Sequence, residues 1–214
     1  MIPGYISVLL LLIVSILWAT GWKDVFAPHM RTGWTVTITL AIAALLIFPL
    51  WSSPFSSEPA VQIHASAWLL MAVCAVLLWR SAKEGQRGYL MLCTLMLAIV
   101  WGSARSLYSH ETMFYWMDPV WDMPLLAGLL CGAFTSDSRH QLVLVVWGAA
   151  LGDFVEALFR DGVIQARIGS WEWWDSVTIA FCSAVAVTVL LRAGRAIGSR
   201  IGAVWLHLRG GRSS

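Results

Sequence analysis

Charged side chains interrupt one of the apolar stretches of this chain, and they are the residues best placed to do chemistry. Asp153 and Glu156 stand about one helical turn apart in the segment from Gln141 to Arg160. Arg160 follows Glu156 in the order that favours an ion pair within a helix. Carboxylates at this spacing could support proton- or cation-linked transport, or share the acid and base roles of an enzyme.

Charges in such a segment need partners. Asp153 lies roughly 9 Å from the nearer end of its predicted helix, and a charge at that depth costs a few kcal/mol unless it is paired, hydrated or protonated. Arg105, near the end of the fourth predicted helix, is the expected partner of Asp153 or Glu156. Asp122, in the first turn of the fifth, is expected at similar depth.

Two interpretations of this cluster stay open at the level of sequence. In the first, five residues form a polar pocket that opens outward: Arg105, Asp122, Asp153, Glu156 and Arg160. In the second, the arginine and its carboxylates form an ion-pair clasp between helices, and the other carboxylates merely lie near the membrane interface.

The composition indicates that lipid surrounds these residues. Of 214 residues, 59% are hydrophobic and 12% are charged, about half the charged fraction of a typical soluble domain. The apolar runs, of about 17 to 20 residues, can cross roughly 30 Å of hydrocarbon as helices and lack the alternation of barrel strands. We therefore predict an all-α, polytopic transmembrane bundle of about seven helices. The predicted helices are 4–22, 32–50, 65–80, 88–107, 119–135, 141–159 and 175–192.

The distribution of lysine and arginine predicts the orientation of the bundle. With seven spans and the N-terminus outside, one face holds only three of these residues: Arg105, Arg160 and Arg167. The opposite face holds the other eleven: Lys23, Arg31, Arg80, Lys83, Arg87, Arg139, Arg192, Arg195, Arg200, Arg209 and Arg212. The positive-inside rule then places the C-terminus in the cytoplasm.

Two pairs of glycines have the spacing that lets transmembrane helices approach closely. Gly128 and Gly132 stand in the fifth predicted helix, and Gly148 and Gly152 stand in the sixth. We expect these consecutive helices to pack on each other as an antiparallel hairpin, which would bring Asp122 near Asp153. Formation of a homo-oligomer through either motif is the alternative.

The chain is expected to divide into a transmembrane domain, residues 1–192, and a basic amphipathic cytoplasmic tail, residues 193–214. Apolar residues of the tail recur at helical spacing, with the arginines mostly off that stripe, which is typical of a segment on an anionic membrane surface. The residues expected at that surface are Arg192, Arg195, Arg200, Trp205 and Arg209. The partners expected are the bilayer, its anionic lipids and other membrane proteins, but no nucleic acid.

Signatures of known enzyme classes are missing from the sequence. It has no G-x-S-x-G or H-E-x-x-H motif and no phosphate-binding glycine loop. The five histidines fall in predicted loops or the tail, and the four cysteines lack metal-ligand spacing. We therefore expect no cofactor and no metal.

Three functions remain open. The leading one is a non-enzymatic membrane protein with a structural, assembly or sensing role. The first alternative is a small proton- or cation-linked transporter that uses the outward-facing acidic cluster, and the second is an intramembrane enzyme of the outer leaflet. The segment 160–174 is left open as well, because its residues 163–168 suit either a short external strand or a loop over the pocket.

Two short stretches resemble a known family. Met1-Ile2-Pro3-Gly4-Tyr5-Ile6-Ser7 and Thr20-Gly21-Trp22-Lys23-Asp24 are similar to the YphA-type membrane proteins, a family of about this length from spore-forming Gram-positive bacteria. The resemblance implies a multi-pass protein of the bacterial plasma membrane. It implies no catalytic residues.

Overall fold

The computed structural model describes residues 3–19, 32–48, 50–53, 61–110, 119–159 and 166–210. Within these ranges lie helices α1 (Tyr5–Ala19), α3 (Thr32–Ile47), α4 (Ala65–Ser81), α5 (Glu84–His110), α6 (Pro119–Phe134), α7 (Ser138–Phe159) and α8 (Trp171–Gly210). The strands in the same ranges are β1 (Trp51–Ser52), β2 (Val61–His64) and β3 (Ala166–Ile168).

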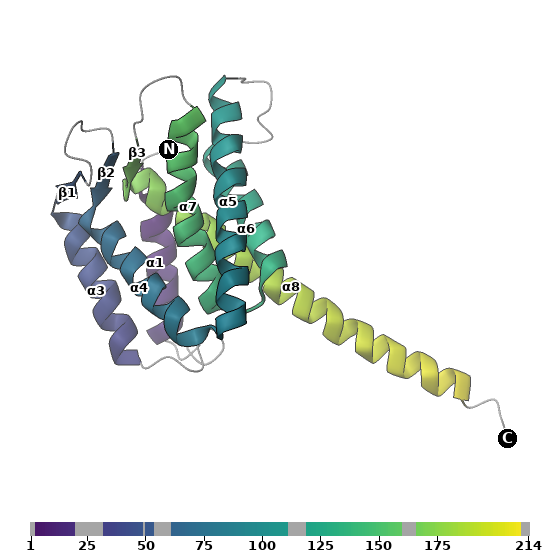
Figure 1. Cartoon of the computed structure of the whole chain (residues 1–214). Helices are drawn as coiled ribbons and strands as arrows, with labels where there is room; N and C mark the ends of the chain where they lie inside the picture. Colours follow the sequence, from purple (N-terminus) through teal and green to yellow (C-terminus); the bar gives the residue numbers. More distant parts are fainter. Residues whose placement is uncertain are drawn as a thin grey trace.

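Helix α7 is the central element of the bundle (Figure 1). It packs most extensively on α5 and also contacts α4, α6 and α8, whereas α1 lies against α8 and α3 against α4. Its burial agrees with this position, because 61% of its most apolar stretch is buried, compared with 33% in α5 and 28% in α8. The residues that could carry chemistry on α7 are therefore surrounded by other helices.

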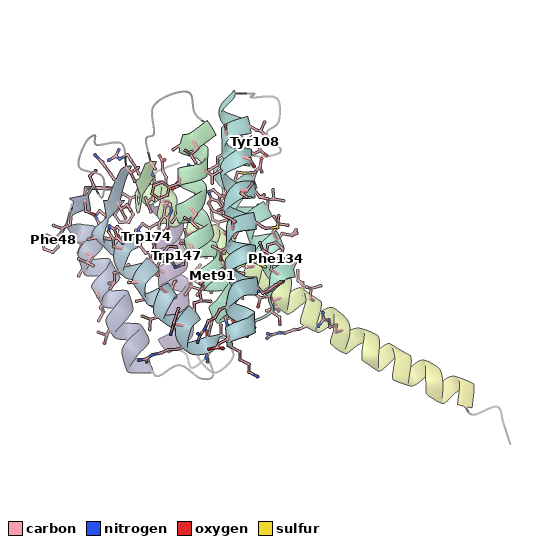
Figure 2. All side chains as sticks on the ribbon, in the orientation of Figure 1. Phe48, Met91, Tyr108, Phe134, Trp147 and Trp174 are labelled. Carbon is pink, nitrogen blue, oxygen red and sulfur yellow. The ribbon has the colours of Figure 1, made fainter. Side chains whose placement is uncertain are left out.

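The outer surface of the bundle is strongly apolar. Leu190 is 70% exposed, Trp79 is 65% exposed, and Met91, labelled in Figure 2, is 53% exposed. Such extensive exposed apolar surface fits contact with lipid rather than water. Three helical segments of the described chain are long and apolar enough to cross a membrane: Glu84–Tyr108, Ser138–Leu158 and Trp171–Arg195. The predicted membrane helix bundle is confirmed.

The seven predicted helices correspond to the seven that the described residues form, with one large difference at the C-terminal end. Helix α8 continues for 40 residues to Gly210, so no helix end marks the predicted boundary at residue 192. A Cβ atom added at Gly194 or Gly198 would meet nothing within 4 Å, and Figure 1 shows this part of α8 leaving the bundle. Contact between this extension and lipid stays a prediction.

A small three-stranded sheet lies at one end of the bundle. From the sequence, a strand was one of two possibilities for residues 163–168, and no other strand was predicted. Strand β2 pairs antiparallel with β1 and parallel with β3. Because β2 precedes α4 and β3 precedes α8, this pairing places both connections at the same end. A seven-span topology requires that arrangement, and the side on which this end lies stays a prediction.

Candidate functional site: an ion-pair cluster between two helices

An arginine on α5 bonds two carboxylates on α7. The Nη1 of Arg105 donates to Oδ1 of Asp153 at 2.9 Å, and its Nε lies 3.2 Å from Oε2 of Glu156. The Asp153 and Glu156 side chains are 10% and 17% exposed, and that of Arg105 is 34% exposed. The pairing expected from sequence is therefore present, and it joins the two helices that pack most extensively.

Two glycines beside these residues let α5 and α7 approach closely. A Cβ atom on Gly102 would lie 2.6 Å from the backbone oxygen of Gly152 and 2.6 Å from Cβ of Val155. The ring of Trp101 packs against Gly152, and its Cδ1 would lie 2.7 Å from a Cβ atom added there. Gly102 precedes Arg105 by one turn and Gly152 adjoins Asp153, so the close approach of the backbones positions the ion pairs.

The charges in the cluster do not cancel. With both carboxylates ionised, one guanidinium faces two negative groups and the formal charge of Arg105, Asp153 and Glu156 together is minus one. A net charge in this setting is costly, so the arrangement favours a further positive group near the carboxylates: a proton, a cation, or Arg160 if its predicted pairing forms. The same bonds also tie the two helices together, because each carboxylate contacts the arginine of the neighbouring helix.

Of the other two residues of the predicted cluster, the structure describes Asp122 but not Arg160. Asp122 is 8% exposed and lies in the first turn of α6, where the sequence predicts it. Arg160 lies outside the described residues, so its pairing with Glu156 stays a prediction. In the part of the chain that the structure describes, no group of three or more His, Cys, Asp or Glu side chains could hold a metal ion.

The predicted packing of the two glycine motifs on each other is wrong. Gly128 and Gly132 of α6 face α8, where added Cβ atoms would meet Ser183 and Val187. Gly148 and Gly152 of α7 face α5, where added Cβ atoms would meet Leu97 and Trp101. The spacing correctly marks close approach, but each motif faces a helix that is not its neighbour in sequence.

Asp175 is a further buried carboxylate, one that sequence reasoning did not single out. It is 4% exposed and accepts hydrogen bonds from the backbone N–H groups of Gly4 and Ser7, both at 2.7 Å, and from the Ser7 hydroxyl at 2.6 Å. Gly4 immediately precedes α1 and Ser7 lies in its first turn, where a helix has unpaired donors and favours negative charge. Asp175 of α8 therefore caps α1 from a distant part of the sequence.

Substitution of Asp175 by alanine tests this cap. We expect the free energy of unfolding to fall by about 2 kcal/mol, because one side chain satisfies three donors at a helix N-terminus. Hydrogen exchange in lipid nanodiscs should show faster exchange in the first turn of α1. Glu172→Ala, which removes an exposed acid from the first turn of α8, the helix that carries Asp175, is the matched control. Equal effects of the two variants would contradict the cap.

Two buried histidines lie at opposite ends of the bundle. His64 precedes α4, where its Nδ1 contacts the Ser66 hydroxyl at 2.7 Å and its Nε2 contacts the Phe48 carbonyl oxygen at 3.1 Å. The sequence predicts a loop at His140, but His140 lies in the first turn of α7. Its Nε2 is 3.2 Å from the Ser81 hydroxyl. Each histidine bridges two segments, and neither contacts the ion-pair cluster through these bonds.

Comparison with known proteins gives one result that covers most of the chain. A family model described as "YphA-like integral membrane protein" matches residues 29–204. No curated protein and no solved structure matches the chain. The matched range includes the helices of the ion-pair cluster, whereas the two N-terminal stretches that carry the resemblance in sequence lie before it.

Proposed function

Because the chain belongs to the YphA-like integral membrane proteins, we propose that it is a non-enzymatic, multi-pass protein of the bacterial plasma membrane. Its role in this proposal is structural, in assembly or in sensing, with the C-terminus in the cytoplasm. The observation that carries the proposal is the engagement of both carboxylates by Arg105, which makes the cluster a clasp between α5 and α7.

The surroundings of the cluster support the structural role. Trp101 is 1% exposed and packs against Gly152, and Ala149 and Ala150, one turn earlier on α7, are fully buried. Helices packed this closely resist relative movement, because protein interiors have little free volume. The proposed role is therefore that of a rigid unit, in which α5 and α7 hold a fixed register within the membrane.

A second candidate function is favoured by the charge of the same cluster. Two carboxylates and one guanidinium carry a formal charge of minus one, which a bound proton or monovalent cation would neutralise. In a small transporter, such a group would exchange its proton or cation with the outer side of the membrane. Enzyme chemistry at the outer leaflet has no comparable support, since Arg105 engages both carboxylates.

One variant separates the two candidates. Combined Arg105→Gln, Asp153→Asn and Glu156→Gln substitutions remove all three charges while they keep side chains of similar size and hydrogen-bonding capacity. Under the structural proposal, wild-type protein in liposomes gives no proton, Na⁺ or K⁺ uptake above that of empty liposomes. The uncharged variant then restores the wild-type phenotype to a strain that lacks the gene.

The opposite pattern would support the transporter. In that case the wild-type protein drives uptake of one of these cations, and the uncharged variant folds but abolishes uptake and fails to restore the phenotype. Arg80→Gln, which removes an exposed arginine from α4, is the matched control and should leave both measurements unchanged. Lipid or peptide turnover that depends on Asp153 would overturn both candidates.

A further inference from the structure

The extension of α8 beyond the bundle is a regular continuation of a membrane-spanning helix. The part of α8 that is apolar enough to cross a membrane ends at Arg195, and the helix runs on to Gly210 without a break. Because the helix is continuous, the angular position of each residue of the extension follows from the helical period of about 100° per residue.

The extension carries an apolar stripe at helical spacing. Val189, Leu190 and Leu191 are all exposed, with Leu190 at 70%, so α8 is already leaving its neighbours at this point, and Leu190 serves as the angular reference for the positions that follow. Five apolar positions of the extension fall within about 60° of that reference: Ile197, Ile201, Val204, Trp205 and Leu208. An apolar stripe past the end of the bundle indicates that the extension also contacts lipid.

The arginines occupy the remaining arc of the extension. Ala180, Ala184 and Thr188 are buried and mark the direction in which α8 packs against the other helices. At about 100° per residue, positions 195 and 209 fall on this side of the helix and position 192 falls just beyond it, whereas position 200 borders the apolar stripe on its other flank. Past the bundle no described helix covers this face, so the positions that face protein in the spanning part carry positive charge in the extension.

The extension leaves the bundle at its most basic end. Arg192 donates to the carbonyl oxygen of Ser136 at 2.7 Å, which ties α8 to the turn between α6 and α7. From Ser176 to the C-terminus the sequence has five arginines and no acidic residue. Figure 1 shows that α8 runs obliquely to α5 and α7, so the extension is inclined away from their common direction.

We propose that the segment from Arg192 to Gly210 is a docking surface for anionic phospholipid headgroups of the membrane that the bundle spans. Its apolar stripe enters the interface, and its arginines bind the phosphates, as in other basic amphipathic helices at membrane surfaces. This proposal is independent of the function proposed for the ion-pair cluster, because it concerns other residues at the opposite end of the bundle.

The test measures hydrogen exchange of the full chain in nanodiscs that contain one protein copy. We compare phosphatidylcholine alone with a mixture of phosphatidylcholine and phosphatidylglycerol. The backbone amides of residues 197–210 should exchange about tenfold more slowly in the anionic discs, because surface-bound helices open less often. Amides in the centre of α7 should exchange at the same rate in both discs, which shows that the bundle is equally folded.

A pair of matched variants assigns the effect to the arginines. Arg195→Gln combined with Arg200→Gln should remove most of the tenfold protection, because each arginine near the surface contributes about fivefold, whereas Arg80→Gln combined with Lys83→Gln should leave it unchanged. Equal exchange of 197–210 in the two lipids would overturn the proposal. Protection that requires two protein copies in one disc would also overturn it, because it would assign the surface to a second chain.

Discussion

Replacement of Arg105 by glutamine is expected to lower the free energy of unfolding by about 3 kcal/mol, which is the lower end of the range for breaking a buried ion pair. The arginine is 34% exposed, so part of its interaction with the carboxylates is screened. Glutamine leaves Asp153 and Glu156 close together without the positive charge that bonds both. Steric trapping in lipid nanodiscs measures this loss for a protein that remains in its membrane.

The matched variant for this prediction removes the whole cluster. Arg105→Gln, Asp153→Asn and Glu156→Gln together leave no charge to compensate, so we expect a loss of only about 1 kcal/mol. Arg80→Gln, at an exposed position, should change the stability by less than about 0.5 kcal/mol. If Arg105→Gln is as stable as wild type within the same margin, the cluster is not a clasp and its charges serve another purpose.

The ion-pair partners could be predicted from sequence because few choices exist inside a membrane. Apolar runs determine where the helices lie, and a charge within such a run must find a partner at similar depth. Asp153 and Glu156 had Arg105 as the obvious candidate, and the structure joins these three residues. The same reasoning placed Asp122 in the first turn of its helix, since Pro119 starts α6 as predicted.

The packing partners of the helices could not be predicted in this way. The glycine spacing of α6 and α7 indicates close approach but contains no information about the helix that approaches. Gly102 escaped notice because it stands outside any such motif, although an alanine there would contact the backbone of Gly152 directly. Such a contact depends on the positions of two helices, and no local pattern in either one encodes it.

Asp175 and the sheet were missed for a similar reason. In sequence, Asp175 resembles an acid in the first turn of a membrane helix, exposed at the interface. It is buried because the N-terminus of α1 lies against it, a contact between residues about 170 positions apart. Strands of two to four residues, such as β1 and β2, are too short for alternation to be recognised.

Substitution of Gly102 by alanine is expected to destabilise the protein by about 3 kcal/mol, because an inserted methyl group has no space between packed helices. Its Cβ would meet the Gly152 oxygen and Val155 Cβ, each at 2.6 Å. The first of these is a backbone atom, so relief requires α5 and α7 to separate. Unfolding by steric trapping should show the loss, and crosslinking between the two helices should show the increased separation.

Gly88 is the matched control on the same helix. A Cβ atom at Gly88 would meet nothing within 4 Å, so Gly88→Ala removes the conformational freedom of glycine without a collision. We expect it to stabilise α5 by up to about 1 kcal/mol. The two substitutions are chemically identical, so their opposite signs would assign the loss at Gly102 to packing. Equal effects would contradict the close approach of α5 and α7.

The clasp and the close approach should also depend on each other. If Gly102→Ala separates the helices, it lengthens the distances from Arg105 to Asp153 and Glu156 and weakens the ion pairs before any arginine is removed. Gly102→Ala combined with Arg105→Gln should therefore cost less than the sum of the single losses, by about 1 kcal/mol. Additive losses would show that the ion pairs persist when the helices separate, and the cluster would then be stabilised by α7 and its surroundings rather than by the register of α5.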